Sequence, residues 1–312
     1  MRHNFILILL IFFTASTSAS HSNCSTEDPK INLNYIKKLI NKMDKEFTAY
    51  ANHLNENIPI TDNRSRVARN IYAKCIKEKV SENKLKQMLP SNLHSLHNSL
   101  SDLFYYSRDN HILIDINTIL NIKQRNGENI NKLVQQQFHR HITIRDFVSA
   151  QTIKESYPSI SFPAIPNITK TELTTKNIII AKNNELEVTS FAYPDEKLLI
   201  IIGSPYCNAS SRFFQWLNKD REFAKMIKKH SFILLNDNIY PNVDTIRYIE
   251  SFTLLSTKQV YKSVEWPEIK YWGTPSFYLI EKGVLKDRYE GWPHKDGELK
   301  FKNFIEKNKL MF

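Results

Sequence analysis

The sequence is poor in cysteine and glycine, and it has no glycine-rich loop that could cradle a phosphate. Three cysteines and six glycines stand among its 312 residues. The missing phosphate loop argues against a nucleotide-using enzyme. No Lys/Arg block is interleaved with aromatic residues, which excludes nucleic acid as a specific partner despite a net charge of +11. No spacing of His, Cys, Asp or Glu suits a metal site, and no cofactor is implied.

Long apolar runs are missing beyond the first residues of the chain. After Met1-Arg2-His3 an apolar run extends from Phe5 to Phe13, and small residues follow up to Ser20. This pattern predicts a secretory signal peptide over residues 1–20. The run is far shorter than the ~20 apolar residues of a membrane span, and no later segment could cross a bilayer. We therefore expect a periplasmic or secreted protein with no stable membrane span after cleavage.

Two of the cysteines fit a structural role. Cys24 follows the predicted signal peptide, and Cys75 shares one face of a helical pattern with Val67 and Ile71. In an oxidising compartment these two cysteines could form a disulfide. Alternatively, Cys75 is a small buried apolar residue and Cys24 a free thiol. The disulfide is favoured, because it leaves Cys207 as the odd, reactive thiol.

Residues 21–155 are predicted to form an all-helical domain. Apolar residues recur at helical spacing in several segments of this part. These segments are residues 36–54, 63–88, 93–106, 112–122 and 127–153. Three prolines then follow, at positions 158, 163 and 166. Because proline removes a hydrogen-bond donor and disfavours helix in the residue before it, we place a linker over residues 156–172.

Residues 173–312 change to short β-rich runs. Continuous apolar runs are typical of central strands, and alternating runs around a turn are typical of hairpins. The predicted strands cover residues 177–181, 185–191, 198–202, 231–235, 275–280 and 284–289. Helices are expected from Cys207 onward, over residues 243–262 and from Asp296 onward. The order ββ–β–α–β–α–β–β–α predicts an α/β domain with a central mixed sheet flanked by helices.

Residues 175–312 resemble the thioredoxin superfamily, and three segments carry the resemblance. The first is Leu198–Ser210, which carries a Cys-x-x-Ser motif with Tyr206 directly before Cys207. The second is Trp272–Ile280, which is similar to the superfamily's cis-proline segment, and the third is Glu281–Trp292, which looks like its final hairpin and following glycine. The single-cysteine site resembles those of periplasmic disulfide reductase and isomerase domains.

The resemblance implies roles for the residues of these motifs. Cys207 is the expected nucleophile, and Ser210 its hydrogen-bond partner. A cysteine at a helix N-terminus has its thiol pKa lowered by the exposed N–H groups. Pro275 is implied to be cis and to lie beside Cys207, so that the backbone of Thr274 can pair with an extended substrate. An apolar rim around the sulfur is assigned to Tyr206 and Trp272.

Two residues depart from the pattern of the superfamily. Ser210 stands where redox proteins usually carry the resolving cysteine. Ile201 stands six residues before Cys207, where many members carry a buried acid. Attack on a substrate disulfide would therefore leave a mixed disulfide, and its release would need an external thiol or a second substrate cysteine. Both departures point to a one-cysteine or non-redox protein.

The leading hypothesis is single-cysteine thiol–disulfide exchange on exported cysteine-containing proteins, either as isomerisation or as capture in a mixed disulfide. The alternative is a redox-silent thioredoxin-like binding module in an envelope assembly, such as a secretion or conjugation apparatus. A third reading is a helical adhesion or effector protein with a decayed redox domain. Whether the chain is an enzyme thus stays open, and the helical domain is a candidate for homodimer formation or for a substrate surface.

Overall fold

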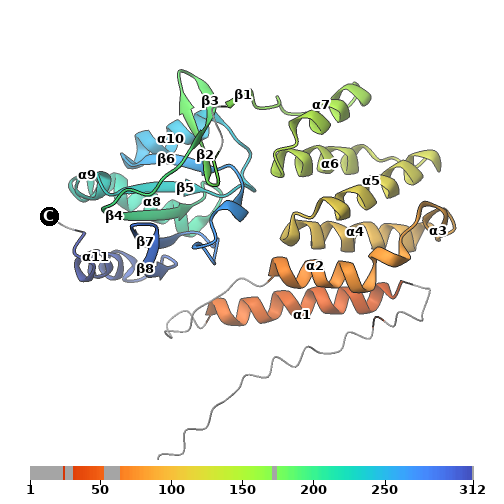
Figure 1. The fold of residues 1–312 in the computed structure, drawn as a ribbon, viewed down its shortest axis with the longest axis horizontal. Coiled ribbons are helices and arrows are strands. Elements are labelled where there is room, and N and C mark those ends of the chain that lie inside the picture. Colours follow the sequence, from red (N-terminus) through yellow and green to blue (C-terminus); the bar gives the residue numbers. More distant parts are fainter. Residues whose placement is uncertain (1–23, 25–30, 53–63, 171–173, 311–312) are drawn as a thin grey trace, which may run out of the picture.

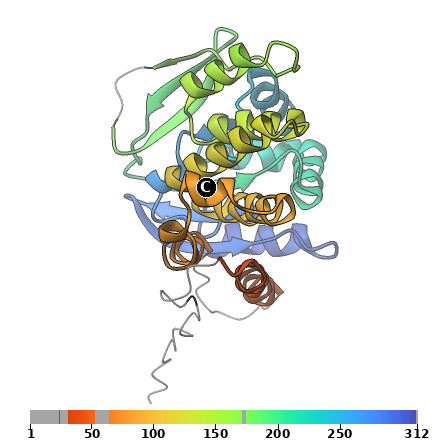
Figure 2. The same ribbon diagram turned by 90° about the vertical axis from the view of Figure 1, so that its right-hand side faces the viewer.

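The structure, a computed structural model, describes Cys24 and residues 31–52, 64–170 and 174–310. The predicted signal peptide lies outside these residues. We name residues 31–156 the helical region and residues 168–310 the sheet region. Figure 1 shows the helical region beside the sheet, and in Figure 2, turned by 90°, the helices lie in front of the strands.

The helices of the helical region pack in succession, α1 on α2, α2 on α4, α4 on α5, α5 on α6 and α6 on α7. The elements are α1 (Leu33–Asn52), α2 (Arg64–Cys75), the 3-10 turn η1 (Lys77–Lys79), α3 (Glu82–Lys86), α4 (Pro90–Ser107), α5 (Asn110–Arg125), α6 (Asn131–Thr143) and α7 (Phe147–Ser156). Their buried faces are mainly Leu and Ile, as the apolar spacing in the sequence predicts.

The helix predicted over residues 63–88 is interrupted after Cys75. Val80 is extended, and Ser81 is also extended while its side chain accepts a hydrogen bond from the Lys84 N–H at 3.5 Å. A serine in this geometry caps a new helix and satisfies one of its free N–H groups. The segment therefore forms α2, η1 and α3 in place of one long helix.

The helix predicted over residues 127–153 is also two helices, and the break lies at Arg145. Arg145 has a left-handed backbone (φ 63°), and Asp146 caps α7 by accepting a hydrogen bond from the Ser149 N–H at 3.1 Å. The left-handed residue ends α6 and turns the chain, since non-glycine residues rarely continue a helix at positive φ.

The sheet region contains an eight-stranded mixed sheet in the order β1-β3-β2-β6-β5-β4-β7-β8. The strands are β1 (Ile168–Lys170), β2 (Asn177–Lys182), β3 (Glu185–Ser190), β4 (Lys197–Gly203), β5 (Ser231–Leu235), β6 (Ser256–Val260), β7 (Ser276–Glu281) and β8 (Val284–Glu290). The helices are α8 (Asn208–Lys219), α9 (Arg221–Lys228), α10 (Val243–Thr253) and α11 (Gly297–Lys307), with a 3-10 turn η2 (Ser263–Glu265). Both predicted hairpins are present, as β2–β3 and β7–β8.

Two strands differ from the prediction. Residues 243–262 are not one helix, because α10 ends at Thr253, Leu254 caps it in a left-handed conformation and β6 follows. Thr257 and Gln259 of β6 are buried, and Gln259 donates its side-chain amide to the carbonyl oxygens of Asn236 (3.0 Å) and Ile239 (2.6 Å). Buried polar residues hid this strand from the apolar pattern. The predicted linker also contains β1, which pairs parallel to β3.

The two faces of the sheet are covered differently. Helices α8 to α11 pack on one face through a core rich in aromatic rings, among them Phe213, Trp216 and Phe301. The other face packs against the chain between β6 and β7, which contributes the buried Trp266 and Ile269. This second covering segment leads directly into Thr274 and Pro275, so its packing positions the residues opposite the cysteine.

Arg145 joins the helical region to the sheet region. Its guanidinium is fully buried and donates to the carbonyl oxygens of Tyr261 (Nε, 3.0 Å) and Val260 (Nη2, 3.2 Å) at the end of β6. The Tyr240 hydroxyl of the sheet region also donates to the carbonyl oxygen of Ala164, which lies in the segment that connects the two regions. Because a buried cation is costly unless hydrogen-bonded, Arg145 favours one placement of the two regions.

Candidate thiol site at the start of α8

The junction between β4 and α8 positions Cys207. β4 ends at Gly203, and Cys207 is the N-cap residue of α8. A side chain at position 203 would not fit, because its Cβ would lie 2.9 Å from Cζ of Phe214. This close approach packs α8 against the end of β4. Cys207 therefore stands where the free N–H groups of the first helical turn are available to its sulfur.

The Cys207 sulfur is half-buried and has polar neighbours from two segments. Its thiol donates to the carbonyl oxygen of Thr274, with Sγ and O separated by 3.0 Å. Ser210, one turn into α8, is fully buried, and its Oγ accepts a hydrogen bond from the Ser204 N–H at 3.3 Å. The Ser210 hydroxyl hydrogen remains available to the sulfur. The structure thus brings the predicted Cys207, Ser210 and Thr274 together.

The pKa of the Cys207 thiol is lowered from its ordinary value by this surrounding. Burial alone raises the pKa, because it disfavours the charged thiolate. That effect is outweighed by the Thr274 side chain, by the backbone N–H groups of Ser210 and Ala209 and by the Ser210 hydroxyl, all of which favour the thiolate. These donors stabilise the thiolate, the form that attacks disulfides.

The loop before β7 is held in place from beneath. The buried Tyr278 hydroxyl donates to the Tyr271 carbonyl oxygen (2.6 Å) and accepts from the Tyr271 N–H (3.2 Å). The Thr274–Pro275 peptide bond is cis, and the Pro275 carbonyl oxygen accepts from the Gly291 N–H at 2.8 Å. These contacts fix the loop that presents the Thr274 carbonyl to the sulfur.

The two residues predicted to form an apolar rim have different surroundings. Trp272 is half-buried and packs against the cluster that contains Trp266. Tyr206 is 76% exposed, although it directly precedes Cys207 in the chain. Trp272 is therefore part of the fold, whereas the Tyr206 ring extends into solvent.

Ile201 is fully buried in the core beneath α8, where it pairs with Phe277 of β7. Its position in the middle of β4 leaves an aliphatic side chain at the place where the resemblance has an acid. Position 201 therefore has no carboxylate that could exchange protons with a thiol.

A cleft of about 670 Å³ begins beside the sulfur site and lies between the two regions. Ser204 and Thr274, both in contact with Cys207, line one end of it. α2 and the end of α4 line the opposite wall, with Arg69 and Arg108 among their residues. The sequence gives no signal for this cleft, because its arginines belong to no motif and only the fold brings them to the site.

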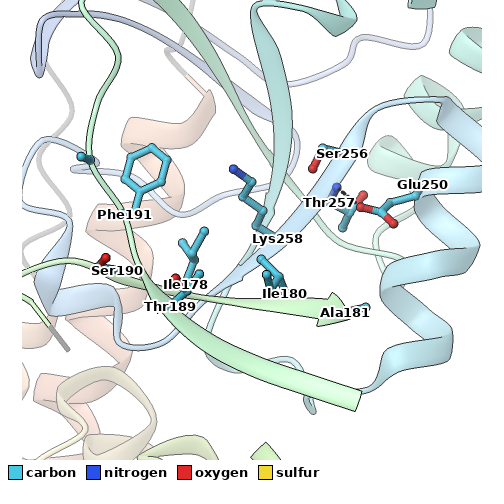
Figure 3. A pocket seen from close by; sticks show the side chains of 11 residues that line it. Ile178, Ile180, Ala181, Thr189, Ser190, Phe191, Glu250, Ser256, Thr257 and Lys258 are labelled. Atoms are coloured by element: carbon cyan, nitrogen blue, oxygen red, sulfur yellow. Dashed lines mark hydrogen bonds between the residues drawn. The ribbon is translucent and has the colours of Figure 1, made fainter. Parts of the chain in front are cut away.

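A second hollow lies between β2, β3, β6 and α10 (Figure 3). Lys258 points into it, with its ammonium 4.5 Å from the ring centre of Phe232 and 5.5 Å from that of Phe191. Burial lowers the pKa of Lys258, and Glu250 opposes this effect. The Glu250 carboxylate in turn accepts from the Thr257 N–H at 2.8 Å. The Lys258 ammonium and the Glu250 carboxylate thus both contact neighbouring residues of the sheet region.

The other two cysteines form a disulfide. Cys24 and Cys75 are bonded, with their Cα atoms 5.0 Å apart, and Cys207 is the free cysteine. This is the pairing that the sequence favours. Because the chain has only three cysteines, Cys207 has no thiol partner within the chain.

Neither a metal centre nor a membrane span is found in the described part of the chain. No three His, Cys, Asp or Glu side chains there gather in a way that could hold a metal ion. None of the described helices combines the length and apolar character needed to cross a bilayer.

No protein-family model matches the chain, and no curated protein matches it either. StoA from Bacillus subtilis is a similar solved structure, 12% identical, with a TM-score of 0.27 over 42% of this chain and 98% of that one. A thioredoxin-like protein from Bacteroides caccae ATCC 43185 is 10% identical, with a TM-score of 0.27 over 80% of this chain and 95% of that one. Likenesses at this level carry no argument about the activity of this chain.

Proposed function

We propose that the chain is an exported, thioredoxin-like protein that exchanges disulfides through one cysteine. The observation that carries the proposal is the placement of the Cys207 sulfur, half-exposed at the start of α8 and 3.0 Å from the Thr274 carbonyl oxygen. The strand and helix order around this contact is similar to that of the superfamily that the sequence resembles. The substrates would be exported proteins that carry disulfides.

The exchange step proceeds in two parts that balance without an added oxidant. The Cys207 thiolate attacks one sulfur of a substrate disulfide, so that a Cys207–substrate bond forms and the other substrate sulfur leaves as a thiolate. A second substrate thiolate then attacks the mixed disulfide, forms a new substrate disulfide and regenerates the Cys207 thiolate. Alternatively, an external thiol attacks the Cys207 sulfur of the mixed disulfide, releases the substrate with both sulfurs as thiols and leaves Cys207 bonded to the external thiol. A second external thiol then restores the Cys207 thiolate and leaves as the disulfide of the two external thiols. The first route is isomerisation, and arrest after the first part is capture.

The helix N-terminus and Ser210 would serve the thiolate in both parts. Donors at the sulfur stabilise Cys207 as the attacking group and again as the leaving group. The backbone of Thr274 would pair with an extended substrate segment, as strand addition does in other peptide-binding proteins. Tyr206, exposed next to the sulfur, and Trp272 would contribute apolar contacts to that segment.

Export and the division of the chain belong to the same proposal. The signal-like residues 1–20 would direct secretion to the periplasm or beyond, and the Cys24–Cys75 disulfide fits an oxidising compartment. We propose a helical domain over residues 21–155, a linker over 156–172 and a thioredoxin-like domain over 173–312. Edman sequencing of the secreted chain would test the cleavage position, and a start other than residue 19 or 21 would contradict it.

The proposed function is tested by whether the chain helps a ribonuclease with scrambled disulfides to recover its activity. The mature chain is incubated with scrambled ribonuclease in a glutathione buffer, beside the variant Cys207→Ser. We expect the native chain to accelerate recovery and the variant to match the buffer alone. Equal recovery with both chains would overturn the enzyme proposal.

A second function is favoured by the absence of a thiol partner for Cys207, since both other cysteines are bonded to each other. The chain would then be a redox-silent module that holds a partner in an envelope assembly. Titration of the Cys207 thiol separates the two functions. A pKa at the free-cysteine value of ~8.5 would favour the binding module over exchange chemistry.

A further inference from the structure

The cleft between the two regions continues from the sulfur site toward α2 and α4. Ser204 and Thr274 form its near end, and each contacts Cys207, the first by accepting from the Cys207 N–H at 3.3 Å. Its far end is lined by the start of α2 and the end of α4. Crevices outside the carboxyl ends of parallel strands are common binding places, and this one lies beyond the ends of β4 and β5. A chain segment lying in it would reach the sulfur.

The walls of the cleft are strongly cationic. The basic residues that line it are Arg64, Arg69, Arg108 and Lys270. Asp237 is the one acid among its described lining residues, and it is buried and accepts from the Ser263 N–H at 2.8 Å. The unbalanced charges therefore belong to the exposed cations, Arg69 and Lys270 above all. An occupant with negative charge would complement them.

Aromatic and amide groups accompany these cations. Arg108 lies over the ring of Tyr105, 5.1 Å from its centre, and Tyr105 is itself 54% exposed. Asn236 and Asn238 line the cleft from the end of β5, and their amides can bond a peptide backbone. Exposed aromatic rings, guanidinium groups and amides together are typical of surfaces that bind polypeptides.

We propose that this cleft binds an acidic, extended segment of the disulfide-bonded substrate and thereby delivers the neighbouring substrate cysteine to Cys207. The inference rests on the proposed exchange function, and it names the class of substrate. The helical region then supplies one wall of the substrate site. Selection arises because Asp or Glu side chains near the substrate cysteine meet Arg69 and Lys270, while a basic segment meets like charge.

A binding experiment tests the cleft apart from the chemistry. The mature chain with Cys207→Ser is titrated with three fluorescent peptides of equal length, which flank one serine with glutamate, glutamine or lysine. We expect the glutamate peptide to bind about tenfold more tightly than the glutamine peptide, and the difference to shrink as salt is raised. A polyanionic single-stranded oligonucleotide of equal charge is the competitor, and equal binding of it would overturn the choice of a peptide.

Charge reversal locates the binding. In the same chain, Arg69→Glu with Lys270→Glu should remove the preference for the glutamate peptide. The matched control reverses two exposed lysines outside the cleft, Lys132→Glu with Lys300→Glu, and so changes the net charge equally. The control should keep the preference. Loss of the preference in both variants, or in neither, would overturn the assignment to the cleft.

A kinetic experiment separates failure of this inference from failure of the exchange function. Each peptide now carries a cysteine in a mixed disulfide with thiopyridine, and the native mature chain is added. Attack by Cys207 on the peptide sulfur releases thiopyridine, whose absorbance gives the rate. A faster reaction of the glutamate peptide supports the inference. Equal rates for all three peptides would contradict the cleft assignment alone, whereas no reaction with any peptide would contradict the exchange function itself.

Discussion

Each region of the molecule carries a sulfur site, and the two sites have different surroundings. Cys75 lies in the helical region, is 2% exposed among Leu and Ile side chains, and is bonded to Cys24. Cys207 lies in the sheet region, half-exposed at a helix start with hydrogen-bond donors around it. A cysteine sulfur surrounded by apolar side chains thus has a structural role, whereas a sulfur surrounded by hydrogen-bond donors is prepared to react.

Alkylation of the unreduced protein is the strongest test of the different roles of the two sulfur sites. We expect iodoacetamide to modify Cys207 and to leave Cys24 and Cys75 untouched, because a disulfide has no thiolate to react. Peptide mass mapping gives the modified positions, and the variant Cys207→Ser is the control that should take up no label. Label on Cys24 or Cys75 before reduction would contradict the assignment of roles.

Removal of the disulfide tests the structural side of the comparison. The bond links residues 51 positions apart, so its loss frees the unfolded chain and should lower the free energy of unfolding by about 3–4 kcal/mol. The variant is Cys24→Ser, and urea unfolding followed by circular dichroism gives the change. Cys207→Ser is the matched cysteine-to-serine control, with an expected change below about 1 kcal/mol. Equal changes in the two variants would remove the distinction between the sites.

Arg145→Met tests whether the two regions behave as one unit. The substitution removes the buried guanidinium and its bonds to the Tyr261 and Val260 carbonyl oxygens, at a cost of about 2–3 kcal/mol. Tryptophan fluorescence reports on the sheet region alone, because all four tryptophans lie there, whereas circular dichroism follows mainly the helices. We expect the two unfolding curves to coincide in the native chain and to separate in the variant.

The control for this change is Arg125→Met. Arg125 is an arginine of the helical region whose side chain is 62% exposed and pairs with Glu82. Exposed ion pairs contribute little, so its loss should cost less than about 1 kcal/mol and leave the curves together. If Arg145→Met also left the curves together and the stability unchanged, the proposed coupling would be wrong.

Ser210→Ala has the smallest expected effect and tests what the Ser210 hydroxyl contributes to the pKa of Cys207. The hydroxyl helps to lower the pKa of Cys207, so its removal should raise that pKa and shift the pH midpoint of alkylation upward. At neutral pH a smaller share of the sulfur is then thiolate, and the rate should fall about threefold. Stopped alkylation at a series of pH values gives the midpoint. Ser211→Ala is the neighbouring control, and an equal shift in both variants would exclude a specific role for Ser210.

Much of the sheet region could be predicted from the sequence, because its strands are continuous apolar runs. Ile200, Ile201 and Ile202 of β4 are buried whichever face they point to, so their pattern is unambiguous. β6 could not be predicted, since Thr257 and Gln259 are polar yet buried through hydrogen bonds that depend on the fold. The breaks at Ser81 and Arg145 were hidden because the apolar spacing continues across them.

The candidate site also has a part that could be predicted from the sequence and a part that could not. Cys207, Ser210 and Pro275 could be found because each belongs to a short motif around a turn. The cleft could not, since Arg69 and Lys270 are ordinary surface residues in sequence and become neighbours of one hollow only after folding. Local motifs predict the reacting atom, while the surface that selects its partner depends on long-range packing.

The half-buried Trp272 has a practical consequence. Trp216, Trp266 and Trp292 are buried, so a water-soluble quencher such as iodide would dim Trp272 before the others. Because Trp272 lines the cleft that starts at Thr274, any molecule entering that cleft would shield it. The intrinsic fluorescence of Trp272 should therefore report whether the cleft is occupied, without an attached dye.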